Sequence, residues 1–202
     1  KTILKEIDRC NSLWHIKSLL FHEIYQKGKI RDEQTILQVK QIADKLDEID
    51  LVNASVNAQY LYHHAKGAYY FAVNDLECSF HHLKANYALI NANEMLKEDK
   101  PNYFFSLLTN LIYVSTKLKF YAEARTYLDV LKSLYTKGEQ AKTVDLEVKY
   151  FSSLFSLELF LLGEQGDFKK AIDLVPQIEQ GYVQYGTQIN SIRKGYIDFK
   201  VA

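Results

Sequence analysis

The chain has 202 residues, of which 48% are hydrophobic and 25% charged, a composition typical of a globular protein. Its formal net charge is zero and neither half is basic, which argues against a protein that tracks nucleic-acid phosphates. The glycine motifs of Rossmann and P-loop nucleotide sites do not occur. Two prolines and eight glycines are too few turn residues for an all-β sandwich.

The sequence shows no signal peptide and no membrane-spanning segment. The N-terminus lacks an apolar stretch, and the longest uncharged run, between Lys100 and Lys117, is short and contains several polar residues. These features predict a cytoplasmic protein. Cys10 and Cys78 are the two cysteines of the chain, and we expect free buried thiols, with a single disulfide as the alternative.

Helical periodicity dominates the chain, with apolar residues three or four positions apart in most stretches. Glycines, a proline and polar pairs such as Asn74-Asp75 separate the stretches, because these residues favour helix ends and turns. Pro176 is expected to kink the helix that contains it. The pattern predicts helices over residues 2–27, 32–49, 53–73, 75–97, 101–117, 120–136, 143–163, 167–184 and 187–202.

Short connections between long helices predict antiparallel helix pairs. The expected pairs cover residues 1–50, 53–97, 101–136 and 143–184, within one domain over residues 1–202. Residues 187–202 then form the first helix of a further pair that has no second helix. Because the end of a helical solenoid requires a polar cap, we expect the chain to be a fragment of a longer protein.

One local pattern repeats along the chain. An aromatic residue stands three positions before a small residue at the start of two predicted helices, with Phe168 before Ala171 and Tyr121 before Ala124. Alignment on the small residue places Ser79 in the same column, and the three positions are 45 and 47 residues apart. The repeat unit is therefore a helix pair of about 45 residues.

Gly67 and Tyr70 fall at the G-x2-Y positions of the repeat that contains Ser79. The chain thus resembles the tetratricopeptide repeat family, in which a first helix carries W-x2-L-G-x2-Y and a second begins with A-x3-F. The family repeat has about 34 residues, so the helices here must be longer by about one to two turns. The resemblance implies an all-α, right-handed superhelical solenoid of antiparallel helix hairpins. A HEAT-like or other solenoid of helical hairpins is the alternative.

The resemblance also implies a groove lined by the first helix of each hairpin. Asn110 falls where many family members hold an asparagine against the backbone of a bound peptide, and Lys117 is placed to meet a carboxylate. The basic residues of a full carboxylate clamp are missing. The partner-binding residues carried over from the family are Ser106, Asn110, Tyr113 and Lys117 of one hairpin, Ser156 and Phe160 of the next, and His64 of the preceding one.

The function that the resemblance implies is a non-enzymatic scaffold that binds a protein or peptide partner in this groove, without a cofactor. The alternative is the ligand- or peptide-sensing domain of a bacterial transcription regulator or signalling protein, whose output domain lies outside this chain. We expect no direct contact with nucleic acid or membrane from this segment. A homodimer through one end of the solenoid is a further alternative for the partner.

A metal-dependent enzyme is the third alternative. The pairs His63-His64 and His81-His82 lie on neighbouring predicted helices, and antiparallel pairing places His64 opposite His82, with Cys78 one turn away. A thiolate and two imidazoles can bind zinc. The ligand spacings of known zinc motifs are absent, however, so we expect exposed or core-edge histidines and no metal.

Overall fold

The structure is a computed structural model that describes residues 2–27, 30–94, 101–137 and 143–189, with residues 191, 194, 195, 197 and 198. These residues form helices and turns, with no strand among them, which confirms the prediction of an all-α protein. The chain divides into two compact units, Lys1–Leu107 and Leu108–Ala202, and the boundary lies within the helix α6 (Pro101–Lys117). The single domain expected from the sequence stays a prediction.

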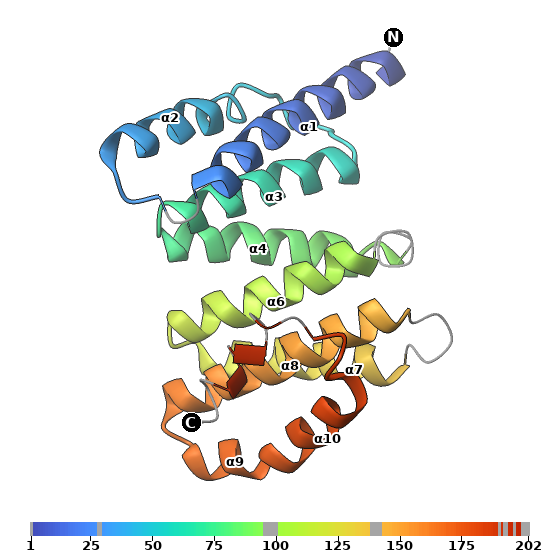
Figure 1. Cartoon of the computed structure of the whole chain (residues 1–202). Coiled ribbons are helices and arrows are strands. Elements are labelled where there is room, and N and C mark those ends of the chain that lie inside the picture. Colours follow the sequence, from blue (N-terminus) through green and yellow to red (C-terminus); the bar gives the residue numbers. More distant parts are fainter. Residues whose placement is uncertain are drawn as a thin grey trace. The chain divides into compact units, whose positions relative to one another are not determined.

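The first unit is built around a long N-terminal helix and a helix hairpin (Figure 1). Its helices before α6 are α1 (Thr2–Lys27), α2 (Glu33–Asp44), α3 (Val56–Ala72) and α4 (Leu76–Asn91). Helix α1 packs against α2 and α3, and α3 packs against α4. The side chains of Asp32, Ser55 and Asp75 cap the starts of α2, α3 and α4 by accepting a hydrogen bond from a backbone N–H three residues later.

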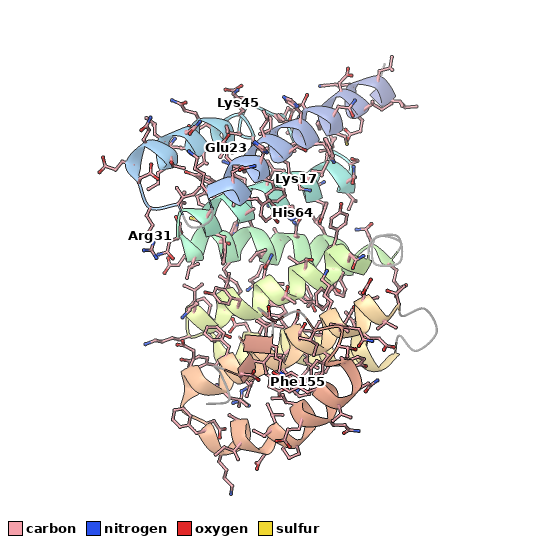
Figure 2. The ribbon with its side chains drawn as sticks, viewed as in Figure 1. Lys17, Glu23, Arg31, Lys45, His64 and Phe155 are labelled. Atoms are coloured by element: carbon pink, nitrogen blue, oxygen red, sulfur yellow. The ribbon has the colours of Figure 1, made fainter. Side chains whose placement is uncertain are left out.

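The second unit contains the rest of α6 and further helices that follow it along the chain (Figure 1). These are α7 (Tyr121–Lys137), α8 (Val144–Gln165), α9 (Phe168–Asp173) and α10 (Val175–Tyr185). Arg125 and Lys132 of α7 bond to Gln165 and Glu158 of α8, at 2.6 and 2.5 Å. The other side of α8 faces α10, where Phe155 is labelled in Figure 2. The hydrophobic cluster of the second unit consists of Val148, Phe151, Phe155, Leu159, Ile178, Tyr185, Ile189 and Ile197.

Most predicted helices agree with the structure to within a few residues, but four differ. The helix predicted over 32–49 ends at Asp44, and a turn follows. The helix predicted over 167–184 is two helices that meet at Leu174, with Pro176 in the first turn of α10, where a missing N–H costs least. The helix predicted over 75–97 ends at Asn91, and its last residues, 95–97, lie outside the described part. The helix predicted over 187–202 begins with a turn at 186–188, residues 191, 194, 195, 197 and 198 are helical, and its other residues after 189 lie outside the described part.

The turns between paired helices share one backbone geometry. Asn74, Lys119 and Gly166 have left-handed φ angles of 64°, 63° and 71°, and they are 45 and 47 residues apart. The N–H of the next residue donates in each case to the carbonyl five positions earlier, at 2.8, 2.8 and 2.9 Å. This is the hydrogen bond of a Schellman helix end. The three turns therefore repeat at the spacing of the column Ser79, Ala124 and Ala171.

The first prediction concerns the left-handed residue of the middle turn. Lys119→Gly is expected to raise the free energy of unfolding by about 1 kcal/mol, because glycine escapes the steric cost that other residues pay at left-handed φ. Asn74→Gly should raise it by less, since asparagine tolerates this conformation better. Urea denaturation measures both values. Lys119→Ala keeps a Cβ and is the control; a gain as large as that of Lys119→Gly would contradict the argument.

The second prediction concerns a close approach between α8 and α10. A Cβ built on Gly181 would lie 1.9 Å from the Phe151 ring, which belongs to the buried cluster of the second unit. Gly181→Ala is therefore expected to lower the free energy of unfolding by about 1–3 kcal/mol. Gly163 of α8 is exposed, with nothing within 4 Å of the same position. Gly163→Ala should raise the free energy by about 1 kcal/mol, because alanine is the better helix former. Thermal unfolding that moved both variants in the same direction would contradict this packing.

Candidate functional site

The residues carried over to the groove include a compact cluster in the second unit, where α6 meets α8. The ring of Tyr113 stacks on Phe160, with centroids 5.2 Å apart and planes 17° from parallel. The Lys117 ammonium lies 4.9 Å from the centroid of the Phe160 ring and 3.3 Å from the Glu164 carboxylate. Both pairs join residues that are 47 positions apart, the spacing of the sequence repeat. We call these four residues the α6–α8 cluster.

Each member of the α6–α8 cluster has a different exposure. Phe160 is only 4% exposed, so Tyr113 and Lys117 pack on a buried ring that offers little surface to a ligand. Tyr113 is half-buried, and the side chains of Lys117 and Glu164 are 38% and 36% exposed. A ligand at this surface would therefore meet the exposed part of Tyr113 and the charges of Lys117 and Glu164.

Asn110 lies on α6 one turn before Tyr113 and is exposed. Within the part of the chain that the structure describes, its side-chain amide makes no hydrogen bond. An amide can donate and accept at the same time, which suits the N–H and C=O of an extended peptide. Asn110, Tyr113 and Lys117 thus form a row along one side of α6.

The remaining predicted residues are not part of the α6–α8 cluster, although Ser156 lies on α8 and Ser106 on α6. Ser156 is one turn before Phe160, and its hydroxyl donates to the Ser152 carbonyl of its own helix at 2.6 Å. Ser106 and His64 belong to the first unit, where Ser106 is half-buried. The structure therefore brings Tyr113, Lys117 and Phe160 together, and it places Ser106 and His64 in the other unit.

His64 is part of an aromatic cluster between α1 and α3, where Figure 2 labels it close to Lys17. Its ring is 5.2 Å from that of Phe21, and its Nδ1 is 3.1 Å from the Tyr60 hydroxyl. Lys17 is buried, with its ammonium 5.1 Å from the centroid of the Phe21 ring. Burial, helped by the positive charge of Lys17, lowers the pKa of His64 to about 3. His64 is consequently a neutral, half-buried imidazole at neutral pH.

The predicted pairing of His64 with His82 is wrong by one residue. His63 is the residue opposite His82, and their Nδ1 atoms are 2.9 Å apart across α3 and α4. Neighbouring residues on a helix point about 100° apart, so this shift turns His64 away from α4. Cys78 and Cys10 are free thiols, as expected, but both are partly exposed rather than buried. The zinc site of His64, Cys78 and His82 is not assembled.

A buried lysine next to this pair was not identified from the sequence. Lys66 of α3 is 4% exposed, and its ammonium lies 2.5 Å from the Asp47 carboxylate in the turn after α2. The Tyr62 hydroxyl donates to the same carboxylate at 2.9 Å. Burial opposes ionisation of Asp47, but these two hydrogen bonds, together with the charges of Lys66 and His82, hold the pKa of the carboxyl below its ordinary value. The position of Lys66 within the small-residue run 65–68 is the sequence feature that indicates its burial.

Among the described residues, no three His, Cys, Asp or Glu side chains converge as ligands of a metal ion. The helices of this same part of the chain are too short or too polar to cross a membrane. Comparison of the chain with protein-family models, with curated proteins and with solved structures finds no match.

The third prediction tests the Asp47–Lys66 pair. Asp47→Asn leaves the Lys66 ammonium with no carboxylate while it stays buried, and it should lower the free energy of unfolding by about 1–2 kcal/mol. The loss is smaller than for a fully buried pair because the Asp47 side chain is 54% exposed. Asp44→Asn is the matched control, since Asp44 pairs with the exposed Lys40 four residues earlier, and it should cost about 0.5 kcal/mol or less. Equal losses in chemical denaturation would contradict a special role for the buried lysine.

Proposed function

We propose that this chain is a non-enzymatic protein-interaction module that binds a partner segment along α6. The ligand would lie in extended form against Asn110, Tyr113 and Lys117, all on α6, the first helix of its hairpin. The observation that carries the proposal is the pairing of repeat-equivalent residues in the α6–α8 cluster. Tyr113 stacks on Phe160, and Lys117 pairs with Glu164, both at the repeat spacing of 47 residues.

Contacts between first helices at a similar spacing within the first unit support this arrangement. Cys10 of α1 lies 3.8 Å from the Ser55 hydroxyl at the start of α3, which is 45 residues later. Tyr60 of α3 is 5.9 Å, between ring centroids, from Tyr103 in the first part of α6. Side-by-side first helices are the feature from which tetratricopeptide repeats build a groove, so these contacts favour the resemblance.

The chemistry of the row on α6 suits a peptide better than a small apolar ligand. Tyr113 and Lys117 are both held on the ring of Phe160, so little side-chain entropy remains to be lost on binding. Asn110 supplies a donor and an acceptor to a peptide unit. Lys117 already binds the carboxylate of Glu164 at an exposed site, and an acidic residue of the ligand would replace it at small cost.

The fourth prediction tests this surface with short linear peptides selected from a random displayed library on the full chain. Asn110→Ala is expected to weaken the selected peptides about tenfold, which corresponds to ~1.4 kcal/mol, because a peptide unit loses its paired hydrogen bonds. Calorimetric or fluorescence titration with synthetic peptides measures the dissociation constants.

Asn91→Ala removes an exposed asparagine at the end of α4 and is the matched control, with no expected change in affinity. Circular dichroism should show equal helix content in the two variants. If Asn110→Ala and Asn91→Ala bind the selected peptides as tightly as the wild-type chain, the ligand does not lie on this side of α6 and the proposal fails.

A further inference from the structure

The contact between His63 and His82 depends on a proton. Their Nδ1 atoms are 2.9 Å apart, which is hydrogen-bond distance, and the two rings lie 5.2 Å apart between α3 and α4. Two imidazole nitrogens can form this bond only if one carries a hydrogen and the other presents a lone pair. The structure therefore requires different tautomers of the two neutral histidines, or one proton shared between them.

The hydrogen bond between the two rings survives one added proton but not two. In the neutral pair, one Nδ1–H donates to the other Nδ1. One added proton leaves this bond in place, because an imidazolium still donates from Nδ1 to a neutral imidazole. A second added proton gives both Nδ1 atoms a hydrogen, removes the acceptor, and brings two positive charges together.

The groups around the two histidines further disfavour two positive charges at this position. Tyr70 stacks on His82 with ring planes 13° apart, and Lys66 places its ammonium 5.9 Å from the centroid of the same Tyr70 ring. Asp47 is the acidic group that faces the pair, and it is already bonded to Lys66 and Tyr62. Within the described residues, the titratable groups around the pair are Asp47 after α2, Tyr62, Lys66 and Tyr70 of α3, and His81 of α4.

We propose that His63 and His82 form an acid-released clasp between α3 and α4, closed by one hydrogen bond at neutral pH and opened when both rings are protonated. Burial, then the charges of His63, His81 and Lys66, lower the pKa of His82 to about 4, although Asp47 opposes this. Burial and the charge of His81 lower the pKa of His63 as well. Lowered pKa values for both histidines agree with a hydrogen bond that is lost when both rings are protonated.

The sign of the effect follows from proton binding. Both histidines have lower pKa values in the folded chain than the ordinary 6.5, so the unfolded chain binds more protons between about pH 6.5 and about pH 4. Stability is therefore complete above pH 6.5 and falls as the pH decreases through this range. Asp47 loses its own charge only at lower pH, because its carboxyl pKa lies below the ordinary 3.8.

The fifth prediction uses thermal unfolding of the full chain at about pH 7.5 and about pH 4.5. The experiment compares the wild-type chain with His63→Asn, His82→Asn and the double variant. The asparagine amide lies near the position of Nδ1 and can accept a hydrogen bond from a protonated partner ring. Each single variant is therefore expected to lose the part of the pH effect that the pair contributes, and its fall in Tm between the two pH values should be smaller than that of the wild type by about 5 °C. The lowered pKa of His64 adds the same fall in Tm to all four chains, so it does not affect the comparison.

The double variant should gain little over either single one, because one bond is shared by both rings. His15→Asn removes an exposed histidine of α1 and is the control, with the pH effect of the wild type. The clasp is overturned if the single variants keep the wild-type fall in Tm, or if their effects add as those of two independent buried histidines.

A measurement on the wild-type chain covers the case of a variant that does not fold. Nuclear magnetic resonance titration of the imidazole resonances should show His63 and His82 taking up protons in two coupled steps, both below the ordinary pKa of 6.5. Loss of α3 and α4 contacts should accompany the second step. Protonation of both rings near pH 6.5 without a change in these contacts would overturn the proposal.

Discussion

One backbone hydrogen bond, repeated three times, sets the geometry on which the helix pairs depend. A left-handed residue ends the first helix, and the next N–H returns to the carbonyl five positions earlier. Ser79, Ala124 and Ala171 each stand five positions after the left-handed residue, and Ser79 and Ala124 are fully buried. The Ser79 hydroxyl donates to the Gly67 carbonyl at 2.9 Å, so turn and small residue together bring the paired helices close.

Two of these turns could be predicted from the residues themselves, because asparagine and glycine tolerate left-handed φ. Lys119 carries no such preference, so its left-handed conformation had no signal in the residue itself. The end of α2 at Asp44 was missed because residues 45–48 turn without a glycine or proline. The sequence predicted a kink at Pro176, and the structure starts a new helix there instead. Proline has no backbone N–H, and the first turn of a helix is where that group has no partner within the helix.

The candidate site could be predicted in part. Repeat counting identified residues, but it could not predict the contacts between helices. Repeat counting identified Tyr113, Lys117 and Phe160, but the stack and the ion pair depend on how α6 meets α8. The His63–His82 pair depends on a helix register that a sequence fixes only to about one residue, and one residue turns a side chain by about 100°. The Asp47–Lys66 bond joins distant positions with no local pattern, so tertiary packing alone determines it.

The two units join their helices by different chemistry. The second unit uses an apolar cluster around Phe151 and Phe155, which has no group that titrates near neutral pH. The first unit uses imidazoles, tyrosines and a buried lysine, which need particular protonation states. All six histidines lie between residues 15 and 82, whereas Asn110, Tyr113 and Lys117 belong to the second unit. Protonation between about pH 4 and about pH 6.5 therefore acts on side chains of the first unit, whereas the residues proposed to bind a ligand lie in the part of α6 that belongs to the second unit.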